Sequence, residues 1–172
     1  MAAPTSQLSL ASHLQSIKPP STVLLVLKAG QRAESMVKAP NGFLLTVVRG
    51  GKCRTAAGLF AELAEALEFP DYFGHNWDAL EECLADLEWL PAKGYVLLFT
   101  DAELILPDDE EEFATFLEVL NDAGEAWATG QAAKRGKPFH SVLAVSEGNK
   151  AKRAHWGLRQ AAGASARTSR NK

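Results

Sequence analysis

Three short apolar runs, separated by segments with helical periodicity, constrain the fold of this chain more than any other feature. The runs are residues 43–49, 95–100 and 141–145, and each has the length and composition of a buried strand. Helical segments between consecutive runs are typical of crossover connections, which join parallel strands. We therefore expect an α/β domain over residues 43–147, with a small three-stranded parallel sheet packed with helices.

Capping residues and helical periodicity place three helices between these runs. Thr55 precedes a segment whose apolar residues recur at helical spacing and which ends near Pro70. Asn76 caps a second predicted helix. Pro107 and the acids of residues 108–112 open a longer third helix, because carboxylates stabilise the positive end of a helix dipole. The predicted order is strand, two helices, strand, helix, strand.

Two segments lie outside this domain. Residues 1–42 form an N-terminal extension, in which the run at 22–28 predicts a possible extra edge strand. Residues 148–172 are basic and have little apolar periodicity, so we expect a disordered tail. The first residues lack the pattern of a signal peptide, and no apolar run reaches the roughly 18 residues of a membrane span. These features predict a cytoplasmic protein without membrane contact.

The net charge of −3 conceals a strong segregation of charge along the chain. Residues 1–60 contain seven Lys or Arg and one acid, residues 61–130 one Lys and nineteen acids, and residues 131–172 ten Lys or Arg and one acid. A surface of one sign attracts molecules of the opposite sign. The acidic centre indicates a solubilising face or a surface for a basic partner. The basic tail suggests a possible weak, nonspecific contact with nucleic acid, so a nucleic-acid-associated protein that acts through this tail is one alternative function.

Catalytic or metal-binding chemistry does not stand out. Cys53 and Cys83 are too few for a disulfide framework and belong to no CxxC pair, which favours reduced thiols. His75 and Asp78 suggest a metal or general-base pair, but no third ligand lies at a suitable spacing. We expect no enzyme activity, no cofactor and no metal.

The segment FPDYFGHNWDALEECLADLEWL, residues 69–90, concentrates acids and aromatics around the second helix. At helical spacing its apolar side chains fall on one side, and Asp78, Glu81 and Glu82 fall on the other. Asp78 and Glu82 are like charges four residues apart, which costs a helix roughly 0.2 to 0.5 kcal/mol. From the spacing alone, a solvated face without function explains these acids slightly better than a binding site.

The same segment resembles the signature of the barstar family, intracellular inhibitors of barnase-type ribonucleases. The resemblance is carried by F-P-D-Y-F-G-H-N-W-D-A-L-E-E-C-L. The family's characteristic pattern is Pro, an acid, two aromatics, Gly, any residue, Asn, an apolar residue and then Asp-Ala-Leu. The predicted order of strands and helices is also that of the family. The resemblance covers residues 43 to about 147, implies a barstar-like fold there, and includes neither basic end.

The resemblance implies inhibition by blocking an active site. In the family, the second helix and the loop before it enter the phosphate-binding cleft of the enzyme, where carboxylates replace substrate phosphates. Charge-assisted hydrogen bonds from arginine to carboxylates are short and strong. The resemblance therefore implies a monomeric immunity protein or antitoxin whose partner is a basic ribonuclease or a related toxin.

The acidic face of the second helix carries the main implied contacts. Asp78 matches an interface aspartate of the family, and Glu82 stands where the most important interface residue is an aspartate. Glu81 and Leu87 replace interface tryptophans. Because of these differences, an alternative remains open, namely a binding module of the same fold for another basic protein or toxin.

The loop before this helix supplies further implied contacts, which are Tyr72, Phe73, Gly74, His75 and Asn76. Tyr72 matches an interface tyrosine, and His75 replaces an acid. From the residues alone, the two aromatics pack inside proteins more often than they bind partners, and Asn76 is most simply a helix cap. From the third helix the resemblance implies Glu111, with Glu110 and Glu112 within one residue.

Overall fold

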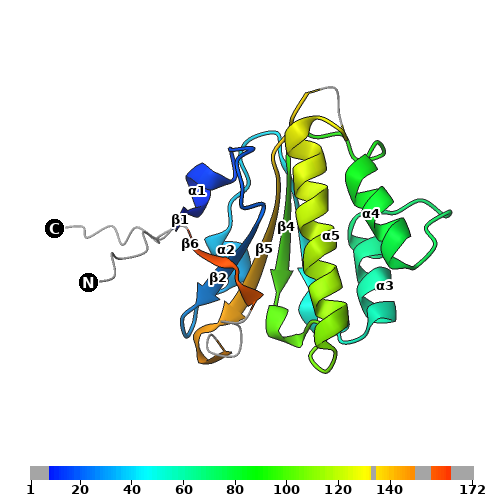
Figure 1. Cartoon of the computed structure of the whole chain (residues 1–172). Helices are drawn as coiled ribbons and strands as arrows, with labels where there is room; N and C mark the ends of the chain where they lie inside the picture. The colour runs from blue at the N-terminus through cyan, green and yellow to red at the C-terminus, as the bar shows by residue number, and fades with distance from the viewer. Residues whose placement is uncertain (1–7, 133–134, 150–155, 164–172) are drawn as a thin grey trace.

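The computed structural model describes residues 8–132, 135–149 and 156–163 (Figure 1). In these residues, one all-parallel sheet has the strand order β1-β6-β2-β5-β4-β3. The strands are β1 (Leu8–Ser9), β2 (Thr22–Leu27), β3 (Leu44–Arg49), β4 (Tyr95–Thr100), β5 (Phe139–Ser146) and β6 (Arg159–Ala162). The helices are α1 (Leu10–His13), α2 (Ala33–Met36), α3 (Ala56–Ala66), α4 (Trp77–Asp86) and α5 (Glu110–Thr129), with 3-10 turns η1 (Gly50–Lys52) and η2 (Ala102–Leu104).

The α/β class is confirmed, but the prediction of a small three-stranded sheet is wrong. The three predicted strands form β3, β4 and β5, and three more strands extend the sheet beyond β5. β2 was expected at an edge, yet it lies between β5 and β6 and pairs with β5 along its whole length. The physical reason is its composition, because four successive residues of TVLLVL are buried, as in a strand covered on both faces.

The prediction of a disordered tail is wrong for the four residues of β6. This strand pairs with β2 on one side and β1 on the other, so it satisfies backbone groups that an open sheet edge leaves unpaired. Before it, Trp156 is 9% exposed and stacks on Phe113 of α5, with ring centroids 4.3 Å apart. Residues 150–155 and 164–172 of the predicted tail lie outside the described residues.

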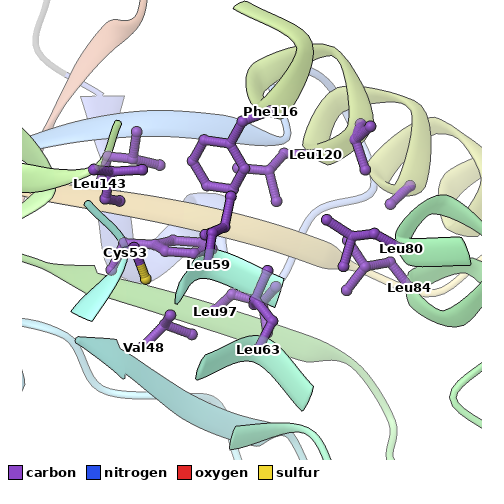
Figure 2. Close-up of a cluster of buried hydrophobic side chains, with 14 of the residues drawn as sticks. Val48, Cys53, Leu59, Leu63, Leu80, Leu84, Leu97, Phe116, Leu120 and Leu143 are labelled. Carbon is purple, nitrogen blue, oxygen red and sulfur yellow. The ribbon is translucent and has the colours of Figure 1, made fainter. Parts of the chain in front are cut away.

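Helices cover both faces of the sheet. α3, α4 and α5 pack on one face, and α1 and α2 on the other (Figure 1). The alternation of side chains along β4 divides the two cores, since Leu97 faces the first set of helices while Val96 and Leu98 face the second. Figure 2 shows the larger core, where the sheet residues Val48, Leu97 and Leu143 meet Leu59, Leu63, Leu80, Leu84, Phe116 and Leu120. This core fixes α4 and α5, which carry the predicted site.

Candidate functional site

Two indole hydrogen bonds anchor α4 to α5. Near the start of both helices, Trp77 Nε1 donates to Glu112 Oε2 over 2.6 Å. Near their ends, Trp127 Nε1 donates to the carbonyl oxygen of Leu84 over 2.8 Å. One bond joins the first turns of the two helices and the other joins residues near their C-terminal ends. The two helices therefore run in the same direction, and α4 is held at both ends.

The start of α4 is capped as the sequence predicts. Asn76 Oδ1 accepts a hydrogen bond from the backbone N–H of Ala79 over 2.8 Å, which satisfies one of the free donors of the first turn. The amide of Asn76 also donates to the carbonyl oxygen of Gly74 over 3.3 Å. His75 lies between them in the left-handed region, with φ of 51°. One side chain therefore ties the loop to the helix.

An open groove runs along α4, and one of its walls is acidic. Asp78, Glu81, Glu82 and Asp86 line this acidic groove from α4, and Ala126, Gln131 and Ala132 line it from α5 and the residues that follow. Among the described residues, none of these four carboxylates forms an ion pair. Sequence reasoning did not assign Asp86 to the site, although it continues the row one turn after Glu82 and this spacing could have identified it.

The negative charge of α4 affects the side chains beside it. Burial raises the pKa of the Cys83 thiol, and the carboxylates of Asp86 and Glu82 raise it further. The pKa of Tyr72 is also raised, first by desolvation and then by negative charges that include the same two carboxylates. The Tyr72 side chain is 74% exposed, so a large aromatic ring stands free beside the acidic groove.

The loop residues of the predicted site divide into exposed and packed positions. Tyr72, Gly74, His75 and Asn76 are exposed. Phe73 is only 7% exposed and packs edge-to-face on Phe69, with ring centroids 4.8 Å apart. The ring centroid of His75 lies 4.7 Å from that of Phe73. Phe73 therefore supports the loop from inside, while Tyr72 projects outward.

The three consecutive acids in the first turn of α5 have different surroundings. Glu112 accepts the Trp77 hydrogen bond and so positions α4. Glu110 lines a separate cavity that also includes Trp156. Glu111, the predicted contact, is exposed and does not line the acidic groove. Sequence reasoning missed the role of Glu112 because its partner lies 35 positions away.

Other expectations from the sequence concern thiols, metals and membranes. Cys53 and Cys83 are free and buried. In the part of the chain that the structure describes, no three His, Cys, Asp or Glu side chains are grouped to hold a metal ion. No helix in that part is both long enough and apolar enough to cross a bilayer.

Comparison with known proteins identifies the family. Residues 43–144 match the family model described as Barstar (barnase inhibitor). A search of curated proteins gave no match. The matched span contains α3, α4, α5 and the loop before α4, whereas β1, β2 and β6 lie outside it. Because the match covers more than half of the chain, this protein belongs to the barstar family.

Proposed function

We propose that this protein inhibits a basic ribonuclease of the barnase type by inserting α4 and the preceding loop into its active site. The main support is the row of Asp78, Glu81, Glu82 and Asp86, which share one groove without an ion-pair partner among the described residues. Like charges on one helix face repel one another. A cleft that binds RNA phosphates through arginine and lysine supplies the missing positive charge.

The anchoring of α4 favours tight binding. Its two indole hydrogen bonds and the Asn76 cap hold the helix that carries the carboxylates in place before the partner arrives. A preorganised surface loses less conformational entropy on association. The negative potential of the groove also steers a basic enzyme toward it and raises the association rate. In this proposal the protein acts as a monomeric immunity protein or antitoxin in the cytoplasm.

A second candidate is a binding module of the same fold for another basic protein or toxin. Two positions favour it, because the family resemblance implies interface tryptophans there. Glu81 is exposed and charged, and Leu87 is buried in the core. Neither side chain offers an aromatic surface to a partner, so the contact area beside the acids differs from that of the family.

A titration of ribonuclease activity tests the proposal. RNA hydrolysis by barnase, and by any small basic nuclease encoded next to the gene, is followed as this protein is added. We expect one-to-one inhibition that Glu82→Ala weakens strongly. If neither enzyme is inhibited at micromolar concentrations, the inhibitor proposal is wrong and the second candidate is favoured.

A further inference from the structure

The chain changes direction across the sheet. From β1 to β2 to β3 it advances along the strand order, and from β3 through β4 and β5 to β6 it returns. The advancing connections carry α1 and α2 on one face, and the returning connections carry α3, α4 and α5 on the other (Figure 1). Trp156, which precedes β6, packs in the same core as these three helices. This use of opposite faces follows from the right-handedness of crossover connections.

β2 and β5 are neighbouring strands whose outgoing connections lie on opposite faces of the sheet. The chain leaves β2 toward α2 on one face, whereas it leaves β5 toward the face on which Trp156 packs. Loops that part in this way open a crevice at the carboxyl ends of the strands, where open α/β sheets bind ligands. β2 lies outside the span that matches the family, so this crevice is an addition to the family domain.

The structure contains a cavity at this position, which we call the β2–β5 crevice. Its volume is about 610 Å³, within the range of sites for small molecules. Residues at or just after the ends of three strands line it, among them Lys28, Gly30, Gln31, Asp101, Ser146 and Glu147. It shares no lining residue with the acidic groove. The strand order and the cavity are separate observations that agree on one place.

The loop after β2 forms a tight turn on one wall of the crevice. Gln31 Oε1 accepts from the backbone N–H of Lys28 over 2.9 Å, and the backbone N–H of Gln31 donates to the Lys28 carbonyl over 3.0 Å. Gly30 completes the turn with φ of 81°, and a side chain there would meet no atom within 4 Å. Lys28 is exposed and forms no ion pair with a described residue. The backbone N–H groups of Lys28 and Gln31 donate within the turn, so the Lys28 ammonium is the group on this wall that attracts an anion.

The residues after β4 and β5 place acceptors in the same crevice. Asp101 and Glu147 are exposed carboxylates without an ion pair in the described ranges. The Ser146 hydroxyl oxygen accepts from Asn149 Nδ2 over 2.9 Å. Carboxylates at the ends of neighbouring strands bind sugar hydroxyls in nucleotide-binding α/β folds. These acceptors suit a ligand that donates several hydrogen bonds.

We propose that the β2–β5 crevice binds a small phosphorylated sugar of the mononucleotide type. Its phosphate lies at Lys28 and the turn at Gly30, and its sugar hydroxyls donate to Asp101 and Glu147. A simple anion is repelled by the two carboxylates, and a simple cation is repelled by Lys28. A ligand with a phosphate at one end and hydroxyls at the other satisfies both sets of groups.

An NMR titration of the full chain tests this proposal. Adenosine 5′-monophosphate, ribose 5-phosphate, adenosine and inorganic phosphate are added separately while backbone amide signals are followed. We expect the first two to shift the amides of residues 28–31 and 146–148. Lys28→Ala and Glu147→Gln should each weaken binding about tenfold, because each removes a charge-assisted hydrogen bond. Lys18→Ala, an exposed lysine before β2, is the matched control and should change nothing.

Three results would overturn the proposal. One is the absence of shifts at these amides with millimolar adenosine 5′-monophosphate in a folded protein. Another is an equal response to inorganic phosphate alone, which would leave no role for the sugar. The third is an equal loss of binding in Lys18→Ala, which would indicate attraction by overall charge. No nuclease is present in the titration, so its outcome is independent of the inhibition assay.

Discussion

The indole N–H of Trp77 donates to the carboxylate of Glu112 over 2.6 Å, and this bond joins the first turn of α5 to the helix that carries the acidic groove. Trp77 also packs edge-to-face on Phe60 of α3, with ring centroids 4.9 Å apart. One side chain therefore contacts both helices that flank α4. The position of the groove depends on this residue as well as on the acids themselves.

Trp77→Phe should keep most of the packing and remove the hydrogen bond. We expect a loss of about 1 to 3 kcal/mol in the free energy of unfolding, because the partly buried Glu112 carboxylate loses its donor. Urea unfolding measures this loss. Glu112→Gln keeps an acceptor oxygen and should cost less. Equal stability of Trp77→Phe and the wild type would show that the bond contributes nothing.

Glu82→Ala should weaken inhibition mainly through faster dissociation. Removing one partner of a desolvated charge pair costs about 2 to 5 kcal/mol. The complex of barnase with barstar, an inhibitor of this protein's family, is one of the systems in which such charge pairs have been measured. Glu88→Ala is the matched control, because Glu88 is exposed and does not line the groove. It should alter mainly the association rate and its salt dependence. Equal, small effects of both changes would mean that only overall acidity matters.

Mild acid should destabilise the protein through His140. This residue is 1% exposed, and burial lowers its pKa to about 4, against a weaker opposing effect of its hydrogen bond to the Ser16 carbonyl. The nearby His13 ring, 4.8 Å away, contributes to this lowered value. The unfolded chain therefore binds a proton more readily. Stability is complete above about pH 6.5 and declines toward pH 4, by up to about 3 kcal/mol.

Urea unfolding between pH 7.5 and pH 4.5 measures this decline. His140→Gln should flatten the pH dependence between 6.5 and 5, where ordinary carboxylates remain ionised. A slope that is the same in the variant and the wild type would assign the decline to other groups.

Glu62→Gln should destabilise the fold far more than Glu65→Gln. Glu62 accepts hydrogen bonds from the backbone N–H, Nε and Nη2 of Arg49 at 3.1, 2.7 and 3.1 Å. Burial opposes its ionisation, but the Arg49 hydrogen bonds outweigh burial and lower its pKa. This stabilisation is present above the ordinary pKa of glutamate and is lost as the pH falls through the lowered value.

We expect a cost of about 1 to 3 kcal/mol for Glu62→Gln at pH 7, since a buried carboxylate is lost from a charge-assisted pair. Glu65 is 72% exposed and lies 3.8 Å from Arg49, so solvent screens it and its loss should cost under about 1 kcal/mol. Thermal unfolding of both variants at one pH compares the two costs directly. Similar melting temperatures of the two variants would contradict the larger contribution of Glu62 to stability.

Trp156→Ala should lower the melting temperature by many degrees. The ring is nearly buried and stacks on Phe113, and truncation of a buried tryptophan typically costs about 3 to 5 kcal/mol. Trp156→Phe should restore most of the stability because it retains a stacked ring. An unchanged melting temperature in Trp156→Ala would support a dispensable tail, as the composition alone predicted.

The matched domain was largely predictable because its signals are local. Thr55 and Asn76 cap α3 and α4 through their own side chains, and helical periodicity placed Asp78, Glu81 and Glu82 on the exposed face. α5 begins three residues after the predicted Pro107, since Asp109 supplies the cap.

The remaining features depend on contacts between distant segments. β6 has the sequence RQAA, which contains no strand signal, and it forms because β1 and β2 provide neighbours. The apolar composition of β2 explains its burial, but its place between β5 and β6 depends on that same pairing. In the loop before α4, two adjacent aromatics have opposite environments, and no periodicity distinguishes the buried Phe73 from the exposed Tyr72.

The insertion of β6 between β1 and β2 has a consequence for synthesis on the ribosome. In the described sheet, β1 pairs with β6 and with no other strand. During translation β1 therefore lacks this partner until β6 has been made, whereas β2 through β5 can pair earlier. Until β6 emerges, β2 presents an open edge of the kind that invites pairing with other chains. The pairing of β6 with β2 closes this edge.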